Sequence, residues 1–223
     1  MKTKNGSASR LANAYYVAGQ AVADWLCSEF PSAIHAYGSK TEIVSRKGRR
    51  ITGQKHAELG TSFQPSISLD RCSRAEAWNC MQKKGFVASS GSIAQLVFRD
   101  NGGRVPDRCD YYLQDLELFH RTFSPFSIPF SRQTDDLWEK VFSAGKDILS
   151  ERENWEAIRY LAAQVEQEGS VNDDEDLLTD TLDRLLPRKR DRTSPINIPP
   201  LDLLASYPAQ AHWSVSDDPR ALP

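Results

Sequence analysis

Residues 151–168 read ERENWEAIRYLAAQVEQE, and their apolar side chains recur at the spacing of one face of an α-helix. Residues 135–149, just before them, have the same amphipathic pattern, and a further helix is predicted over about 174–186, where Pro187 stops it. Together these segments predict a helical, bundle-like region over residues 131–187. The apolar face of residues 151–168 consists of Trp155, Ile158, Leu161, Ala162 and Val165.

At the N-terminus, Ser9 can cap a helix over about 10–29, and Pro31 is a plausible stop. The apolar stretch from Leu11 to Leu26 is too short to span a bilayer, and polar residues interrupt it. The first residues are charged, but no apolar segment with a cleavage site follows them, so we expect no secretion.

The middle of the chain is predicted to contain both a helix and strands. Ser73-Arg-Ala-Glu76 is a capping box that starts a helix running to about Lys84, with Gly85 as its C-cap. Residues 86–98 then predict two strands that turn at Ser90-Gly91. Residues 36–62 are polar and rich in glycine, with room for short strands only.

The expected fold class is therefore α+β. Residues 1–130 form a small module, rich in loops and strands, that carries a basic loop. Residues 131–187 form the helical second half. Residues 188–223 form an irregular, Pro-rich tail, which we expect to be dispensable for folding because it lacks periodic apolar residues.

Composition sets limits on function. The chain has 223 residues, 39% of them hydrophobic and 26% charged, with a net charge of −2. Any binding of nucleic acid must therefore come from local patches of charge. The four cysteines are scattered and are expected to be reduced, which favours a cytoplasmic protein.

The strongest local patch lies between Lys40 and His56, where six cations stand against one acid, Glu42. Glycines and hydroxyl side chains among them let backbone amides approach phosphates. We predict that this loop contacts nucleic acid, although a solvated surface loop remains the alternative. The predicted contact residues are Lys40, Arg46, Lys47, Arg49, Arg50, Gln54 and Lys55.

Neither a metal, a cofactor nor a catalytic site is predicted. Cys72 and Cys80 are eight residues apart, about 12 Å along a helix, which is too far for two thiolates to share one zinc ion. His120 and Cys109 have no third group to orient them as a catalytic dyad. The sequence contains no hydrolase elbow or zinc-protease helix. We therefore expect a protein that is not an enzyme.

Residues 35–90 contain, in this order, His35-Ala-Tyr-Gly38, Arg46-Lys-Gly-Arg-Arg50, Thr61-Ser-Phe63, Cys72 with Cys80, and Gly85-Phe-Val87. This order of features resembles the small, large-subunit-like protein of type IV CRISPR effector complexes, with the outline of a degenerate zinc knuckle.

The resemblance implies a non-catalytic subunit of an RNA-guided, DNA-targeting complex with a role in antiviral defence. Such a subunit would bind the 5′ end of the guide RNA and read the short duplex motif that flanks the target, the PAM. The implied partners are guide RNA, target double-stranded DNA, other effector subunits and a DinG-type helicase encoded on the same plasmid. No membrane partner is implied.

Two other functions remain open from the sequence. A helical scaffold or adaptor would bind proteins through its helices and Pro-rich tail, without nucleic acid. An accessory protein of plasmid maintenance would bind DNA on its own.

Overall fold

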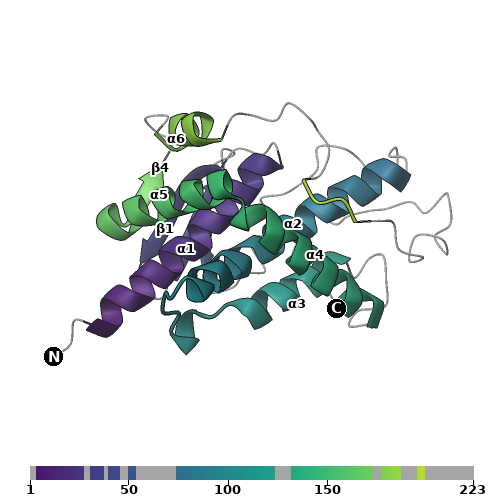
Figure 1. The fold of residues 1–223 in the computed structure, drawn as a ribbon, viewed down its shortest axis with the longest axis horizontal. Coiled ribbons are helices and arrows are strands. Elements are labelled where there is room, and N and C mark those ends of the chain that lie inside the picture. Colours follow the sequence, from purple (N-terminus) through teal and green to yellow (C-terminus); the bar gives the residue numbers. More distant parts are fainter. Residues whose placement is uncertain are drawn as a thin grey trace.

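The computed structural model describes residues 4–27, 31–37, 40–45, 50–53, 74–123, 132–172, 177–186 and 195–198. Helices dominate these residues, and the longest two, α1 and α2, come from the first half of the chain (Figure 1). The helices are α1 (Lys4–Leu26), α2 (Arg74–Asp100), α3 (Tyr112–Phe123), α4 (Arg132–Ser150), α5 (Arg152–Glu168) and α6 (Leu177–Leu185), with a 3-10 turn, η3, at Asp107–Cys109.

The central helix is α1, which packs against α2 and α5, while α4 and α3 cover α2 (Figure 1). Nearly every described side chain of α1 beyond Leu11 is buried, polar ones included. A helix that is covered on all sides belongs to the interior of a bundle. One hydrophobic cluster runs through the molecule from Ala14 on α1 to Ile198 near the C-terminus.

A small antiparallel sheet, of strand order β3-β2-β1-β4, accompanies the helices. It lies next to α1, and β4 directly follows α5. Its strands are β1 (Pro31–Tyr37), β2 (Lys40–Ser45), β3 (Arg50–Gly53) and β4 (Ser170–Asn172).

The predicted α+β fold class is wrong, and the fold is a helical bundle. The error lies at Gly85 and Ser90-Gly91, which the sequence analysis assigned to a helix end and a hairpin turn. In the structure, α2 continues through them to Asp100. Its serines remain compatible with a helix because Ser89 Oγ donates to the Gly85 carbonyl at 3.0 Å, one turn back.

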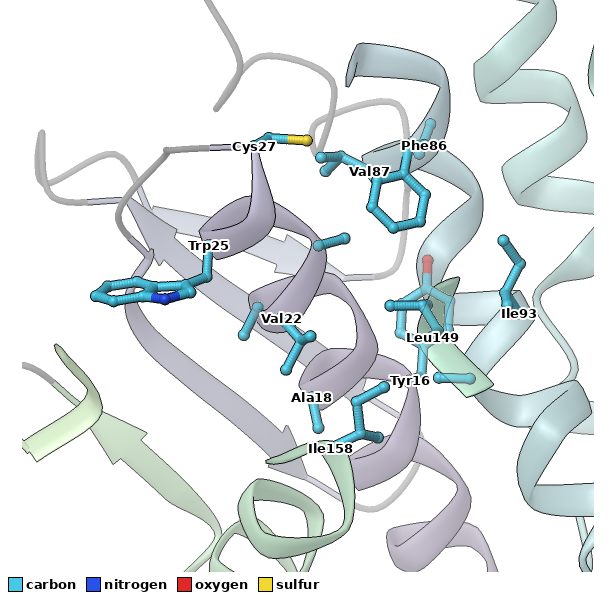
Figure 2. Packing of buried hydrophobic residues seen from close by; sticks show 14 of the residues in the cluster. Tyr16, Ala18, Val22, Trp25, Cys27, Phe86, Val87, Ile93, Leu149 and Ile158 are labelled. Atoms are coloured by element: carbon cyan, nitrogen blue, oxygen red, sulfur yellow. The ribbon is translucent and has the colours of Figure 1, made fainter. Parts of the chain in front are cut away.

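The glycines have a different role, which is to let α1 and α2 approach closely. A Cβ on Gly91 would overlap the ring of Tyr16, and a Cβ on Gly19 would lie 2.8 Å from the Ser90 carbonyl oxygen. Figure 2 shows the resulting packing, in which Tyr16 and Val22 of α1 face the side chains of α2 and α5. Glycine here removes side-chain bulk at a helix crossing, and no turn is needed.

The helical second half agrees with its prediction. The segment predicted over 151–168 is α5, which ends at Gly169 in the left-handed conformation, with φ of 85°. The Gly169 amide donates to the Val165 carbonyl at 2.8 Å, closing the last turn.

Part of the predicted tail belongs to the core. Residues 195–198, which we call the strap, run beside α2 (the short yellow segment in Figure 1). Ile196 and Ile198 are buried, with exposed fractions of 1% and 5%. The strap therefore contributes apolar burial that the sequence pattern did not reveal, since two isoleucines are too few to set a period.

The close crossing of α1 and α2 gives a test. Gly91→Ala should destabilise the protein by about 1–3 kcal/mol, because the added methyl overpacks the Tyr16 ring. This cost outweighs the gain of about 1 kcal/mol that alanine normally brings to a helix interior. The measurement is chemical denaturation of the full chain. Ser143→Ala, at an exposed position of α4, is the control and should be neutral or slightly stabilising. An unchanged midpoint for Gly91→Ala would contradict the proposed crossing.

Candidate nucleic-acid interface

Part of the predicted basic loop forms two paired strands, β2 and β3. β2 and β3 are antiparallel, with Ile43 opposite Ile51 and Val44 opposite Arg50. Lys40 opens β2 and Arg50 opens β3, so the two cations lie toward opposite ends of the pair. The structure thus pairs two parts of the basic segment as neighbouring strands of the sheet.

The other predicted contact residues lie outside the described residues. Arg46, Lys47 and Arg49 stand between the two strands in the sequence, while Gln54 and Lys55 follow β3.

The sheet joins β2 and β3, which we call the ribbon, to the bundle. β1 pairs with β2 on one side and with β4 on the other, and Ile34 of β1 is opposite both Ile43 and Val171. Since β4 follows α5 directly, β1 and β4 attach the sheet to the helices, and β3 is the strand furthest from β4. β2 is therefore an inner strand of the sheet, and it also contacts α1.

The segment that carries β1, β2 and β3 leaves from the end of α1 and returns at the start of α2. Trp25, near the end of α1, donates its indole N–H to the Leu186 carbonyl at 3.1 Å. Lys83 of α2 donates to the Cys27 carbonyl at 3.2 Å, which ties the two helices together at this point. Burial lowers the pKa of Lys84 beside it.

A second cluster of polar groups lies inside the bundle around Asp115 of α3, which is fully buried. Its Oδ1 accepts a hydrogen bond from the Tyr16 hydroxyl at 2.7 Å, and Tyr16 in turn accepts from Gln20 at 3.1 Å. Its Oδ2 accepts from both the backbone N–H of Ser92, at 3.2 Å, and the Ser92 hydroxyl. The carboxyl group thereby links α1, α2 and α3.

Burial is the main cause of the raised pKa values in this cluster. It raises the pKa of Asp115 to about 7, although the hydrogen bonds from Ser92 and Tyr16 act in the opposite direction. Burial and the neighbouring Asp115 also raise the pKa of Tyr16 well above its usual value. The pKa of Tyr111 is raised as well, mainly by burial, and its hydroxyl donates to Asn13 at 3.1 Å. These groups hold helices together from the interior.

The cysteines and histidines do not assemble into a site among the described residues, where no group of three or more potential metal ligands gathers. Cys27 and Cys109 are buried and Cys80 is half-buried, all as free thiols. Cys109 contacts the Ser9 carbonyl at 3.9 Å, whereas His120 contacts Asp135 at 3.0 Å. Cys72, the other candidate zinc ligand, lies outside the described residues.

The Asp115 cluster was not predicted from the sequence, although the sequence contains one signal of it. Asn13, Gln20 and Asp24 interrupt the apolar first helix, and the structure buries all three. Buried polar side chains need partners, so polar residues in a central helix indicate polar partners elsewhere in the core. The partners themselves could not be found from the sequence, because Asp115 lies 99 positions from Tyr16.

The fold and the interface together define a helical bundle with a small attached sheet and a basic two-stranded ribbon. No protein-family model matches this sequence, and a search of curated proteins finds no significant match. Within the described part of the chain, none of the helices has both the length and the apolar character needed to cross a membrane.

The buried carboxyl group gives a second test. Asp115 binds its proton up to a pH of about 7 in the folded state, against an ordinary pKa of 3.8. The folded state therefore holds the extra proton between these values, and stability from this group is present below pH 4 and is lost as the pH rises through 7. Between these two pH values, the free energy of unfolding should fall by up to about 1.4 kcal/mol for each unit of pH increase.

Urea denaturation of the full chain across pH 4–8 measures this slope. Asp115→Asn should flatten it, because asparagine has no proton to release. Asp147→Asn is the matched control, since it removes an equal charge from an exposed position of α4. Equal slopes in the wild type and in Asp115→Asn would show that another group sets the pH dependence.

Proposed function

We propose that this chain binds nucleic acid through residues 40–55 and is a non-catalytic subunit of a type IV CRISPR RNA-guided complex. In that role it holds the 5′ end of the guide RNA and the duplex motif that flanks the DNA target. Base pairing reads the target sequence, so the subunit needs only backbone contacts and a few base contacts.

The observation that carries the proposal is the concentration of cations on and between two paired strands. Six cations accompany one acid between Lys40 and His56, in a chain whose net charge is −2. The pairing of β2 with β3 confines the two ends of this basic segment to one ribbon. Cations that are concentrated in one segment of a chain can displace counterions from phosphates, which supplies most of the affinity of nonspecific binding.

The arrangement of the sheet supports the same function. β1 and β4 connect the ribbon to the bundle, whereas β3 is the edge strand on the far side from β4. Among the described residues, no further strand pairs with the outer edge of β3. The near-neutral net charge suits a subunit that binds nucleic acid together with other, more basic subunits.

The resemblance to effector subunits supports the assignment to a complex. It rests on the order of features from His35 to Val87, of which His35–Tyr37 lie in β1 and Gly85–Val87 lie within α2. The guide RNA, the target DNA, the other effector subunits and a DinG-type helicase are the proposed partners.

Removal of the basic charges tests the proposal. The combined change Arg46→Ala, Lys47→Ala, Arg49→Ala and Arg50→Ala should weaken binding of the target duplex by the assembled complex for every DNA sequence alike. Each lost phosphate contact should reduce the slope of log affinity against log salt by about 1. The measurement is DNA affinity across a salt series, with circular dichroism of the variant chain to verify its helices.

A matched control separates the position of the charges from their number. Arg104→Ala, Lys140→Ala, Arg152→Ala and Arg184→Ala together remove four cations from exposed positions of the described structure. This variant should keep its affinity and salt slope. If both variants bind as the wild type does, residues 40–55 do not contact nucleic acid, and a scaffold or adaptor function is then favoured.

A further inference from the structure

The strap, residues 195–198, packs against α2 in a way that resembles a bound peptide. It has no regular secondary structure, and its residues alternate in exposure: Ile196 and Ile198 are buried, whereas Asn197 between them is exposed. Such alternation is expected of an extended segment, because successive side chains of an extended chain point to opposite sides. The strap therefore presents one apolar face to the bundle.

Two side chains of α2 bind the backbone of the second isoleucine. The N–H group of Ile198 donates to Gln82 Oε1 at 2.7 Å, and the Ile198 carbonyl accepts from the Trp78 indole N–H at 2.9 Å. Trp78 and Gln82 are four residues apart, so they lie on the same face of the helix. Both are nearly fully buried, with exposed fractions of 5% and 6%.

These contacts divide recognition into two parts. Hydrogen bonds to the backbone of Ile198 hold any extended segment whose second apolar residue has an N–H group. The burial of Ile196 and Ile198 selects apolar side chains two positions apart. Proteins that bind extended peptides use the same division, with main-chain hydrogen bonds for affinity and pockets for alternate side chains for specificity.

We propose that the face of α2 at Trp78 and Gln82 is a binding site for an extended peptide, and that residues 195–198 of this chain are its ligand. The segment binds in cis in the folded chain, and the same segment also binds when it is supplied as a separate peptide. This inference does not depend on the proposed binding of nucleic acid.

The number of residues that join the strap to α6 decides how strongly a separate peptide must compete with the strap. Leu186, held by Trp25, and Pro195 are separated by eight residues, 187–194. A short tether of this kind keeps the cis segment at an effective concentration in the millimolar range. A separate peptide therefore binds measurably only after the cis segment has been weakened.

The experiment uses the full chain with Ile196→Ser and Ile198→Ser, which releases the strap, and a fluorescein-labelled peptide of residues 193–201. Fluorescence polarisation should show saturable binding, at least about tenfold tighter to this variant than to the wild-type chain. It should also be at least about tenfold tighter than binding of a peptide with both isoleucines replaced by serine, because each buried isoleucine contributes at least that factor. A peptide with Asn197→Ala should bind as the unchanged peptide does.

Two further variants keep the test decisive. If circular dichroism shows that the double serine variant has lost its helices, Ile198→Val replaces it, because it weakens the cis segment by a single methylene. Gln82→Leu in the released chain removes the acceptor for the Ile198 N–H and should weaken the peptide at least about threefold.

The proposal is overturned if a folded, released chain does not bind the peptide. Equal binding of the serine peptide, or equal binding to the wild-type chain, would also overturn it, because the peptide would then bind without using the Trp78 and Gln82 site.

Discussion

The close crossing of α1 and α2 is the constraint on which the rest of the bundle depends. Gly19 and Gly91 leave no room for a side chain at this point, so the backbones come close and the Tyr16 ring fits against Gly91. α5 then packs on the other side of α1, and α4 packs on α2. Since α1 is covered by these elements and by the sheet, its polar residues must find partners inside the core. The Asp115 cluster follows directly from that burial, because its carboxyl group accepts from both of the crossing helices.

The sequence predicted the helices of the second half well and the long helix α2 poorly, for one physical reason. Trp155, Ile158, Leu161, Ala162 and Val165 repeat at helical spacing, because α5 has one buried face and one exposed face. α2 is buried along most of its length, so its residues show no such contrast, and the run Ala88-Ser-Ser-Gly-Ser92 has the composition of a turn. Small residues at a tight helix crossing and small residues in a turn cannot be distinguished without knowledge of the partner helix.

The candidate sites also differ in how far the sequence predicts them. The basic segment could be found from the sequence because its cations lie within 16 residues of one another, from Lys40 to Lys55. The structure adds the pairing of Val44 with Arg50. The Asp115 cluster and the strap contacts join residues about 100 positions apart, such as Tyr16 with Asp115 and Trp78 with Ile198. No local pattern records such pairs. The polar interruptions of α1 indicated that partners existed, but only the fold identifies them.

The strap is one of two places at which a buried tryptophan binds the C-terminal part of the chain. The segment that carries β1, β2 and β3 leaves near Trp25 and returns near Trp78, and both indoles donate to carbonyls of the C-terminal part of the chain, at Leu186 and Ile198. Burial of two isoleucines contributes about 3–6 kcal/mol, two hydrogen bonds contribute about 1–3 kcal/mol, and ordering four residues costs about 4–8 kcal/mol. The net contribution is therefore only a few kcal/mol, so the strap is held far more weakly than the helices it contacts. Release of the strap should leave the bundle folded, because the contacts of the α1–α2 crossing and of the Asp115 cluster do not include residues 195–198.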